Sequence, residues 1–312
     1  MKRRNYSLLF ALLVLGLLES LVWGQDKVAP DRSENVAGQA TGIWDSARAK
    51  TCSVATLKGA YGILLKGVIV NIPGVPSGPT ASVGIITYDG AGNYASTFTT
   101  NFNGFILEQQ LSGTYTINSN CTGRLVSGLA TAPLIIIDEG REVRSLQAYP
   151  AGVAMPPGAG WVIEAVGKKI APAINEKGTI YDRARTFYCT PGNVAGEYAV
   201  TANGMVLNAP PFPAGPALGL SRVNLNDAGQ SVVEGTFNFN GMILPITDTA
   251  TGTSLNSDCT STAVQTSNGA IQKTVFVNGG TEFFFLQLPP AGAPNVPGAG
   301  IVFWGEGRRI HR

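Results

Sequence analysis

Few residues in this chain could do acid–base chemistry, and most of them are carboxylates. The sole histidine, His311, is the penultimate residue, which argues against a Ser–His–Asp triad and against a histidine zinc site. Glu142 and Glu282 are candidate catalytic residues because they occupy the same position in two copies of a repeat. Glu108 and Glu164 are candidates if burial inside one domain raises their pKa. A glutamate beside a turn is more commonly a solvated surface residue. No stretch of the sequence forms a catalytic motif.

Those residues are set in a chain that carries two copies of one long unit. Asn101–Gly104, with the sequence NFNG, returns as Asn238–Gly241, and Pro157–Gly160 returns as Pro297–Gly300. The offset between the copies is 137 residues at NFNG and 140 at the second motif. A period this long predicts a domain rather than a stacking solenoid element. We place the copies at residues 52–170 and 189–312, joined by a linker at residues 171–188.

Four cysteines repeat with the units. The spacing from Cys52 to Cys121 is 69 residues and the spacing from Cys189 to Cys259 is 70, which predicts one disulfide in each copy. Closing a loop of this size contributes about 4 kcal/mol in the chain-entropy model. There is no C-x-x-C, so a structural metal site is not indicated, and we expect neither metal nor cofactor.

The N-terminus has the pattern of a secretory signal peptide at residues 1–24. Lys2, Arg3 and Arg4 precede the apolar run Leu8–Leu18, and Val22–Gly24 is a small-x-small type cleavage site. The alternative is an uncleaved anchor, but the apolar run is shorter than the roughly 20 residues that a spanning helix needs. We therefore expect a secreted protein, periplasmic or extracellular, whose residues 25–51 form a flexible arm.

Composition and turn signals indicate an all-β fold. Charged residues make up 13% of the chain, against about 25% in ordinary globular domains, and there are 39 glycines and 19 prolines. Asp89–Asn93 (DGAGN) separates two runs rich in β-branched and aromatic residues, and Asn103-Gly104 suits a type I′ hairpin turn. About eight short strands in each copy predict two tandem antiparallel β-barrels, with two β-sandwiches as the alternative.

Two proline-rich loops also repeat. The pattern N-x-P-x-x-P-x-G-P occurs at residues 71–79 and 208–216, and a second loop, Pro150–Gly160, returns as Pro290–Gly300. Proline rigidifies a loop before binding, so these loops are candidates for the rim of a ligand site at a barrel mouth. The interpretation that we rank first is structural: they are long connections that resist fraying and pairing with other strand edges. The candidate rim residues are Asn71, Pro73, Pro76, Asn208, Pro210 and Pro213.

Several of these motifs carry a family resemblance. Leu57–Tyr61 (L-x-G-x-Y), Asp89–Asn93 and Gly113–Gly123 (GTYTINSNCTG) resemble secreted bacterial proteins of unknown function with lipocalin-type or allene oxide cyclase-like eight-stranded barrels. The resemblance covers residues 52–170 well and residues 189–310 less well. It implies the barrel fold. No catalytic residue of a cyclase matches a position in this sequence, so none is carried over.

Three functions remain open at this point. We favour a non-catalytic binding protein for a small, possibly apolar, molecule, because rigid repeated loops surround barrels that lack a catalytic motif. The alternatives are an isomerase or cyclase with a buried carboxylate, and a structural surface or matrix module. The formal net charge of +2, with scattered Lys and Arg, does not favour nucleic acid as a partner, and after signal cleavage no membrane partner is expected.

Overall fold

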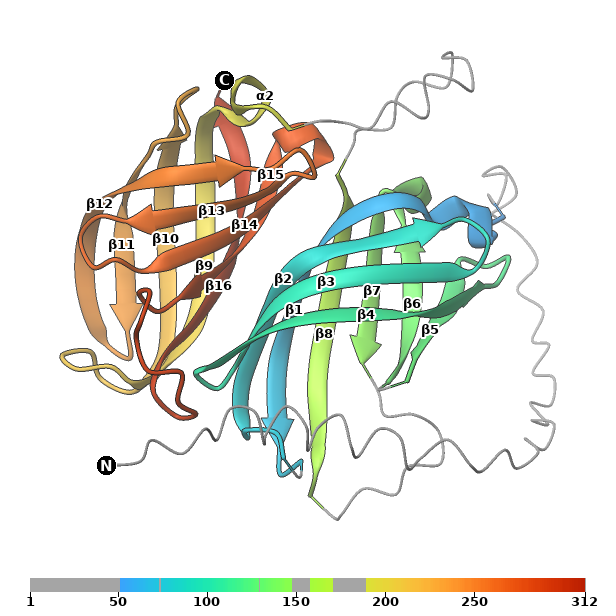
Figure 1. Cartoon of the computed structure of the whole chain (residues 1–312), viewed down its shortest axis with the longest axis horizontal. Coiled ribbons are helices and arrows are strands. Elements are labelled where there is room, and N and C mark those ends of the chain that lie inside the picture. Colours follow the sequence, from blue (N-terminus) through green and yellow to red (C-terminus); the bar gives the residue numbers. More distant parts are fainter. Residues whose placement is uncertain (1–50, 73, 129, 148–157, 171–188, 312) are drawn as a thin grey trace, which may run out of the picture. The chain divides into compact units, whose positions relative to one another are not determined.

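The computed structural model describes residues 51–72, 74–128, 130–147, 158–170 and 189–311. The predicted signal peptide, the linker and nearly all of the N-terminal arm lie outside the described residues. Residues 51–312 form one compact unit. It contains two closed antiparallel barrels of eight strands each, which confirms the predicted barrels over the sandwich alternative (Figure 1).

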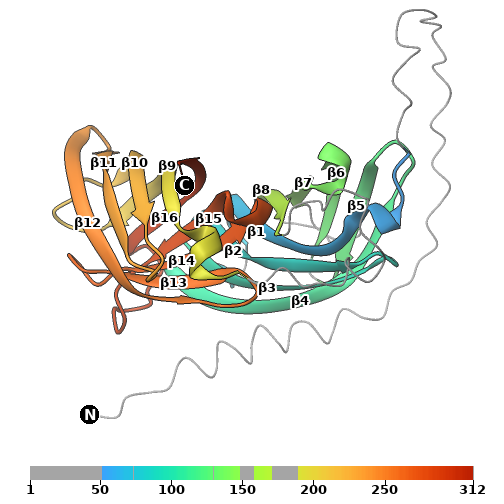
Figure 2. The same cartoon turned by 90° about the horizontal axis from the view of Figure 1, so that it is seen from above.

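Each barrel is an up-and-down meander in which consecutive strands pair and the last strand pairs with the first. Figure 2 shows how strongly the long strands β1–β4 curve as the wall of the first barrel. The first barrel comprises β1 (Lys58–Val70), β2 (Gly78–Asp89), β3 (Asn93–Phe102), β4 (Phe105–Ile117), β5 (Thr122–Ser127), β6 (Thr131–Ile137), β7 (Glu142–Gln147) and β8 (Gly160–Lys169). The second comprises β9 (Gly196–Asn208), β10 (Gly215–Leu225), β11 (Ser231–Phe239), β12 (Met242–Leu255), β13 (Thr260–Gln265), β14 (Ile271–Val277), β15 (Glu282–Leu288) and β16 (Gly300–His311).

The predicted turns connect these strands. Asn103 and Gly104 have φ of 49° and 93°, the positive values that a type I′ turn requires at both central positions, and they join β3 to β4. The Asp89 carboxylate accepts hydrogen bonds from the backbone N–H groups of Ala91 and Asn93, which holds the turn between β2 and β3. Asp89 therefore has a structural role, and these bonds, with one from the Asn93 side chain, lower its pKa.

One end of each barrel is closed by a disulfide, a short helical segment and a buried tyrosine, and we call it the disulfide end. Cys52 bonds to Cys121 and Cys189 bonds to Cys259, as predicted. In the first barrel, the Tyr61 hydroxyl donates to the Gly140 carbonyl of the 3-10 turn η2 (Asp138–Gly140). Tyr61, the tyrosine of the L-x-G-x-Y motif, thus has a structural role: it closes this end of the barrel.

The second barrel repeats this closure at its own disulfide end. The Tyr198 hydroxyl donates to the Gly280 carbonyl of η4 (Asn278–Gly280) at 2.7 Å. Tyr61 and Tyr198 are both fully buried and occupy the same position in the two copies. Two further short helical segments lie at these ends, η1 (Val54–Leu57) in the first barrel and α2 (Pro191–Val194) in the second.

Alternate side chains of each strand fill the barrel interior. The middle of the second barrel holds a column of phenylalanines: the ring centroids of Phe276 and Phe283 are 5.7 Å apart, and those of Phe283 and Phe285 are 6.3 Å apart. Phe284, between them in sequence, points outward and is nevertheless buried, because it packs in a core cluster that includes side chains of both barrels. The outer faces of some strands are therefore as apolar as the interior.

Candidate functional site

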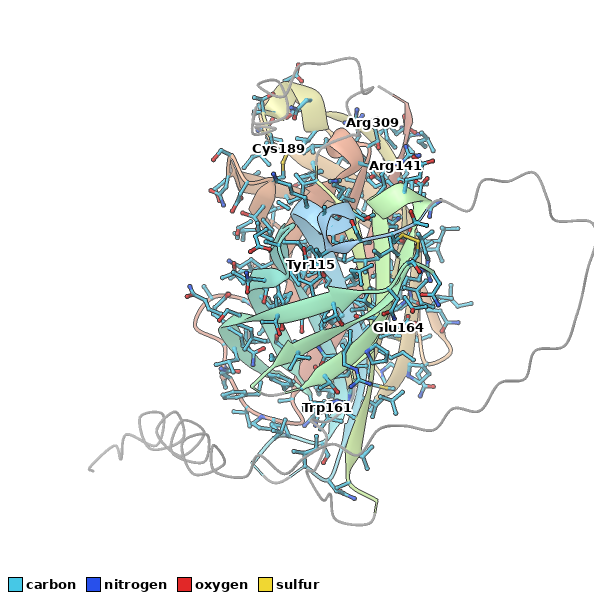
Figure 3. All side chains as sticks on the ribbon, turned by 90° about the vertical axis from the view of Figure 1, so that its right-hand side faces the viewer. Tyr115, Arg141, Trp161, Glu164, Cys189 and Arg309 are labelled. Carbon is cyan, nitrogen blue, oxygen red and sulfur yellow. A yellow bond between two sulfur atoms is a disulfide. The ribbon has the colours of Figure 1, made fainter. Side chains whose placement is uncertain are left out.

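The four candidate carboxylates lie on outer faces of the barrels, and none is placed for acid–base chemistry. Glu108 is exposed on β4 and accepts a 2.8 Å hydrogen bond from the Thr99 hydroxyl. Glu164, labelled in Figure 3, is exposed on β8 and pairs with Lys66 at 2.9 Å. The hypothesis that Glu108 and Glu164 are buried is therefore wrong: both belong to the strand face that points away from the interior.

The repeated glutamates, Glu142 and Glu282, are partly buried and engaged in ion pairs. Glu142 accepts a 2.8 Å hydrogen bond from Arg144, two residues along β7. Glu282 accepts hydrogen bonds from Lys168 of the first barrel and from Asn278 at 2.9 Å. Burial raises the pKa of Glu282, but the Lys168 and Asn278 hydrogen bonds and the charge of Lys168 outweigh it and leave the pKa below its ordinary value. Glu282 is thus an ionised structural group.

The predicted rim residues lie in the loops between β1 and β2 and between β9 and β10. Asn71, Asn208 and Pro210 are exposed, Pro76 and Pro213 are half-buried, and Pro73 lies outside the described residues. The loops are internally ordered: the Asn71 N–H donates to the Ser77 hydroxyl at 2.8 Å. Phe212 packs on Phe239 with ring centroids 4.5 Å apart, which fills this end of the second barrel. A ligand role for the proline loops stays a prediction.

A cavity of about 300 Å³ lies at the opposite, disulfide end of the second barrel. Its floor is apolar and buried, made by Val194 of α2, Leu225 at the end of β10 and Phe276 of β14. Its rim is exposed and carries two polar side chains, Asn226 and Ser254. An apolar floor with a few polar groups at the mouth is the usual composition of a small-molecule site, and the volume is at the lower end of the usual range.

The segment that forms one side of this cavity is held by Arg309, which is labelled in Figure 3. The Arg309 guanidinium donates to the carbonyls of Asn193 and Gly280, each at 2.7 Å, and to the Tyr198 hydroxyl at 2.8 Å. Cys189, two residues before α2, is bonded to Cys259. The Val194 side of the cavity is therefore fixed by one terminal nitrogen of the Arg309 guanidinium and by a disulfide.

In the first barrel the corresponding space is filled by tyrosines. Tyr88 packs edge-on against Tyr61 and Tyr115, with ring centroids 5.3 and 5.1 Å away, and it contacts Tyr94 at 6.2 Å. The Tyr115 hydroxyl, labelled in Figure 3, donates to the Val54 carbonyl of η1 at 2.9 Å. Burial raises the pKa values of Tyr61 and Tyr88, so both hydroxyls stay protonated at neutral pH. These tyrosines are packing groups.

One residue that lines the cavity is smaller than its counterpart in the first copy. At the repeat offset of 137, Leu225 corresponds to Tyr88. Phe276, which also lines the cavity, is larger than its counterpart Ile136, so Leu225 is the substitution that leaves room at this end. From the sequence we noted only that the family resemblance covers residues 189–310 less well than residues 52–170. Comparison of residue volumes at matched positions was the signal that points to the cavity.

The described residues show no arrangement suited to a metal or to a membrane helix. Within them, no group of three or more His, Cys, Asp or Glu side chains could hold a metal ion. Asp248, buried inside the second barrel, is fully engaged: it accepts hydrogen bonds from the Ser267 hydroxyl at 2.8 Å and the Thr249 N–H at 2.8 Å. No helix in the described part of the chain is long and apolar enough to span a bilayer.

Comparison with known proteins adds a likeness at the level of structure. No family model matches the chain, and no curated protein matches it either. The chain is similar to a solved DUF3598-family protein of unknown function from Nostoc punctiforme, with 10% identity, coverage of 83% of this chain and 99% of that chain, and a TM-score of 0.26. It is also similar to a protein from Nitrosomonas europaea provisionally described as AttH, with 6% identity, coverage of 82% and 93%, and a TM-score of 0.23. The two closed eight-stranded barrels fit a lipocalin-like fold.

Proposed function

We propose that the protein is a secreted, non-catalytic carrier of one small, largely apolar molecule, which binds at the disulfide end of the second barrel. The observation that carries this proposal is the cavity of about 300 Å³ above Leu225 and Phe276. A cavity of half this volume in another protein is large enough for benzene, so a molecule of one or two rings fits. Ser254 at the rim suits a ligand with one polar group that faces the solvent, whereas the Asn226 side chain is held in its turn by hydrogen bonds with Ala228 and Gln230.

Secretion and family membership belong to the same proposal. Two disulfides favour an oxidising compartment, and the N-terminal pattern of residues 1–24 supports export. The resemblance to lipocalin-type and allene oxide cyclase-like barrels supports a binding role. A cyclase-type activity finds less support, because the candidate carboxylates lie on the outer faces of the strands and three of them pair with a basic side chain.

Leu225→Tyr tests the proposal, because it restores in the second barrel the residue that fills the first. The assay is displacement of a fluorescent naphthalene-sulfonate dye by small apolar alcohols and phenols. We expect the wild type to bind the dye and the alcohols to displace it, while Leu225→Tyr lowers the affinity at least 10-fold because its ring occupies the cavity. Tyr88→Phe in the first barrel is the matched control and should leave binding unchanged. Equal binding by wild type and Leu225→Tyr, or no binding by the wild type, would sink the proposal.

A further inference from the structure

The two barrels of the chain contact each other through different faces of the same repeat. The first barrel contributes outward side chains of its first two strands, which we call face A. The second barrel contributes outward side chains of its last three strands, which we call face B. Face A of the first barrel comprises Gly62, Leu64, Ala81, Val83 and Ile85, and face B of the second comprises Val275, Val277, Phe284, Leu286 and Val302.

This internal contact is close, and its central side chains are buried. A Cβ atom at Gly62 would lie 2.5 Å from Cγ1 of Val277, so the backbone of β1 rests directly on β14. Val83 is 4% exposed and Val302 is fully buried. An ion pair flanks the apolar contact, because Lys168 of β8 donates to Glu282 of β15.

The NFNG hairpin of the first barrel extends the same interface. The Asn103 carbonyl accepts a 2.7 Å hydrogen bond from the Gly298 N–H, in the second copy's Pro290–Gly300 loop. Gly104 is required there, because a Cβ atom would lie 2.3 Å from the Ala299 carbonyl oxygen. In the second copy the matching Gly241 has no other atom within 4 Å of that position among the described residues. The same motif is thus covered in one copy and open in the other.

A contact between unlike faces leaves one of each face unused. Face B of the first barrel and face A of the second are the leftover faces, and both expose large apolar side chains beside a few charged ones. Val162 is 74% exposed, whereas its counterpart Val302 is fully buried; Leu220 is 65% exposed, whereas its counterpart Val83 is 4% exposed. Other exposed apolar side chains of the leftover faces are Ile135, Ile137, Leu146, Leu218 and, on the adjoining strand, Ile243. Contiguous exposed apolar patches of this kind mark interaction sites.

The charges of the internal contact also recur on the leftover faces. At the repeat offset of 140, Lys168 corresponds to Arg308 and Glu282 corresponds to Glu142. The charges at these two positions keep their signs, so Arg308 of one protein molecule can pair with Glu142 of another. Arg308 has a side chain that is 69% exposed, with its nearest carboxylate oxygen 3.8 Å away on Glu282.

We propose that the protein associates with itself head to tail, with face A of the second barrel of one copy bound to face B of the first barrel of the next. The occupant of the exposed faces is thus a second copy of this chain, held by a counterpart of the contact that its own two barrels make. Such a heterologous contact builds an open chain, or a ring if the rotation closes. Among the differences from the internal contact, Ala199 stands for Gly62, Thr201 for Leu64, Arg222 for Ile85 and Arg144 for Phe284. The Ala199 methyl group prevents the close approach that Gly62 allows, so the contact between molecules is weaker than the internal one and depends on concentration.

Two single substitutions and their mixture test the head-to-tail geometry. Leu220→Arg places a charge on face A of the second barrel, and Val162→Arg places one on face B of the first. Both side chains are exposed, so neither change disturbs the core. Sedimentation velocity of the full chain should show a wild-type mass that rises with concentration above the mass of one chain. Each variant alone should stay at the mass of one chain. Their equimolar mixture should form a species of two chains and nothing larger, because each variant keeps one intact face.

The ion pair gives a second and independent readout. Arg308→Glu should weaken association at least 10-fold, and adding Glu142→Arg in the same chain should restore it, because the two reversed charges meet between copies. Circular dichroism and thermal unfolding confirm that each variant is folded. The proposal is overturned if the wild type keeps the mass of one chain at concentrations up to about 1 mM. It is also overturned if either variant associates like the wild type, or if the mixture of variants stays at the mass of one chain.

Discussion

At the scale of residues, a few side chains give two copies of one unit different properties. Tyr88 and Tyr115 fill the disulfide end of the first barrel, whereas Leu225, at the position of Tyr88, lines a cavity in the second. Glu142 and Glu282 keep the same charge at matched positions, but Glu282 alone reaches across to a lysine of the other barrel. Both copies keep the same strands and disulfide, and single residue differences between them decide whether the disulfide end is filled or has a cavity.

Glu282→Gln should lower the free energy of unfolding by about 1.5–3 kcal/mol at neutral pH, because Lys168, which is 6% exposed, loses its charged acceptor. The pKa of Glu282 is lowered in the folded protein, so its contribution is present above the unfolded pKa of about 4.3. It is lost as the pH falls through the lower folded value. Urea unfolding of wild type and variant from pH 7 down to pH 3 measures this. Glu142→Gln is the matched control, with a loss under about 1 kcal/mol. A wild-type advantage that stays constant down to pH 3 would refute the ion-pair account.

At the scale of elements, the strands and their turns were predictable from the sequence, but the direction of individual side chains was not. Asn-Gly turns, paired cysteines and β-branched runs each have a local cause, so the eight strands and both disulfides were predicted. Alternation identifies two faces of a strand without saying which one is inside. Here the usual criterion fails, because Leu286 on an outer face is fully buried while Glu108 on another is exposed. Contact between the barrels, which is not a local property, makes the difference.

The disulfide of the second barrel should matter for binding as well as for stability. Cys189→Ser with Cys259→Ser frees the segment that carries Val194, so we expect dye binding to weaken at least 10-fold and stability to fall by about 2–4 kcal/mol. Cys52→Ser with Cys121→Ser should cost a similar stability and leave dye binding intact. Chemical denaturation and dye titration measure the two effects. Loss of binding in both double variants would show that the disulfide acts through global stability alone.

At the scale of the whole molecule, the barrels have divided two tasks between them. The first has a filled disulfide end, and the outward side chains of its strands β1 and β2 pack against the second barrel. The second carries the cavity. This division could not be read from strand patterns, since both copies have the same turns and cysteines. It becomes visible in the sequence only when residue volumes are compared at matched positions, as for Tyr88 and Leu225.

The most direct test of this division is the number of ligand molecules that one chain holds, measured by native mass spectrometry with a saturating aromatic alcohol. The account predicts one molecule for each wild-type chain, and two for Tyr88→Leu, because that substitution gives the first barrel the residue that lines the cavity in the second. Tyr88→Phe keeps the ring and should still bind one molecule. Two molecules on the wild type, or none on it, would contradict the claim that residue volume at the disulfide end decides which barrel binds.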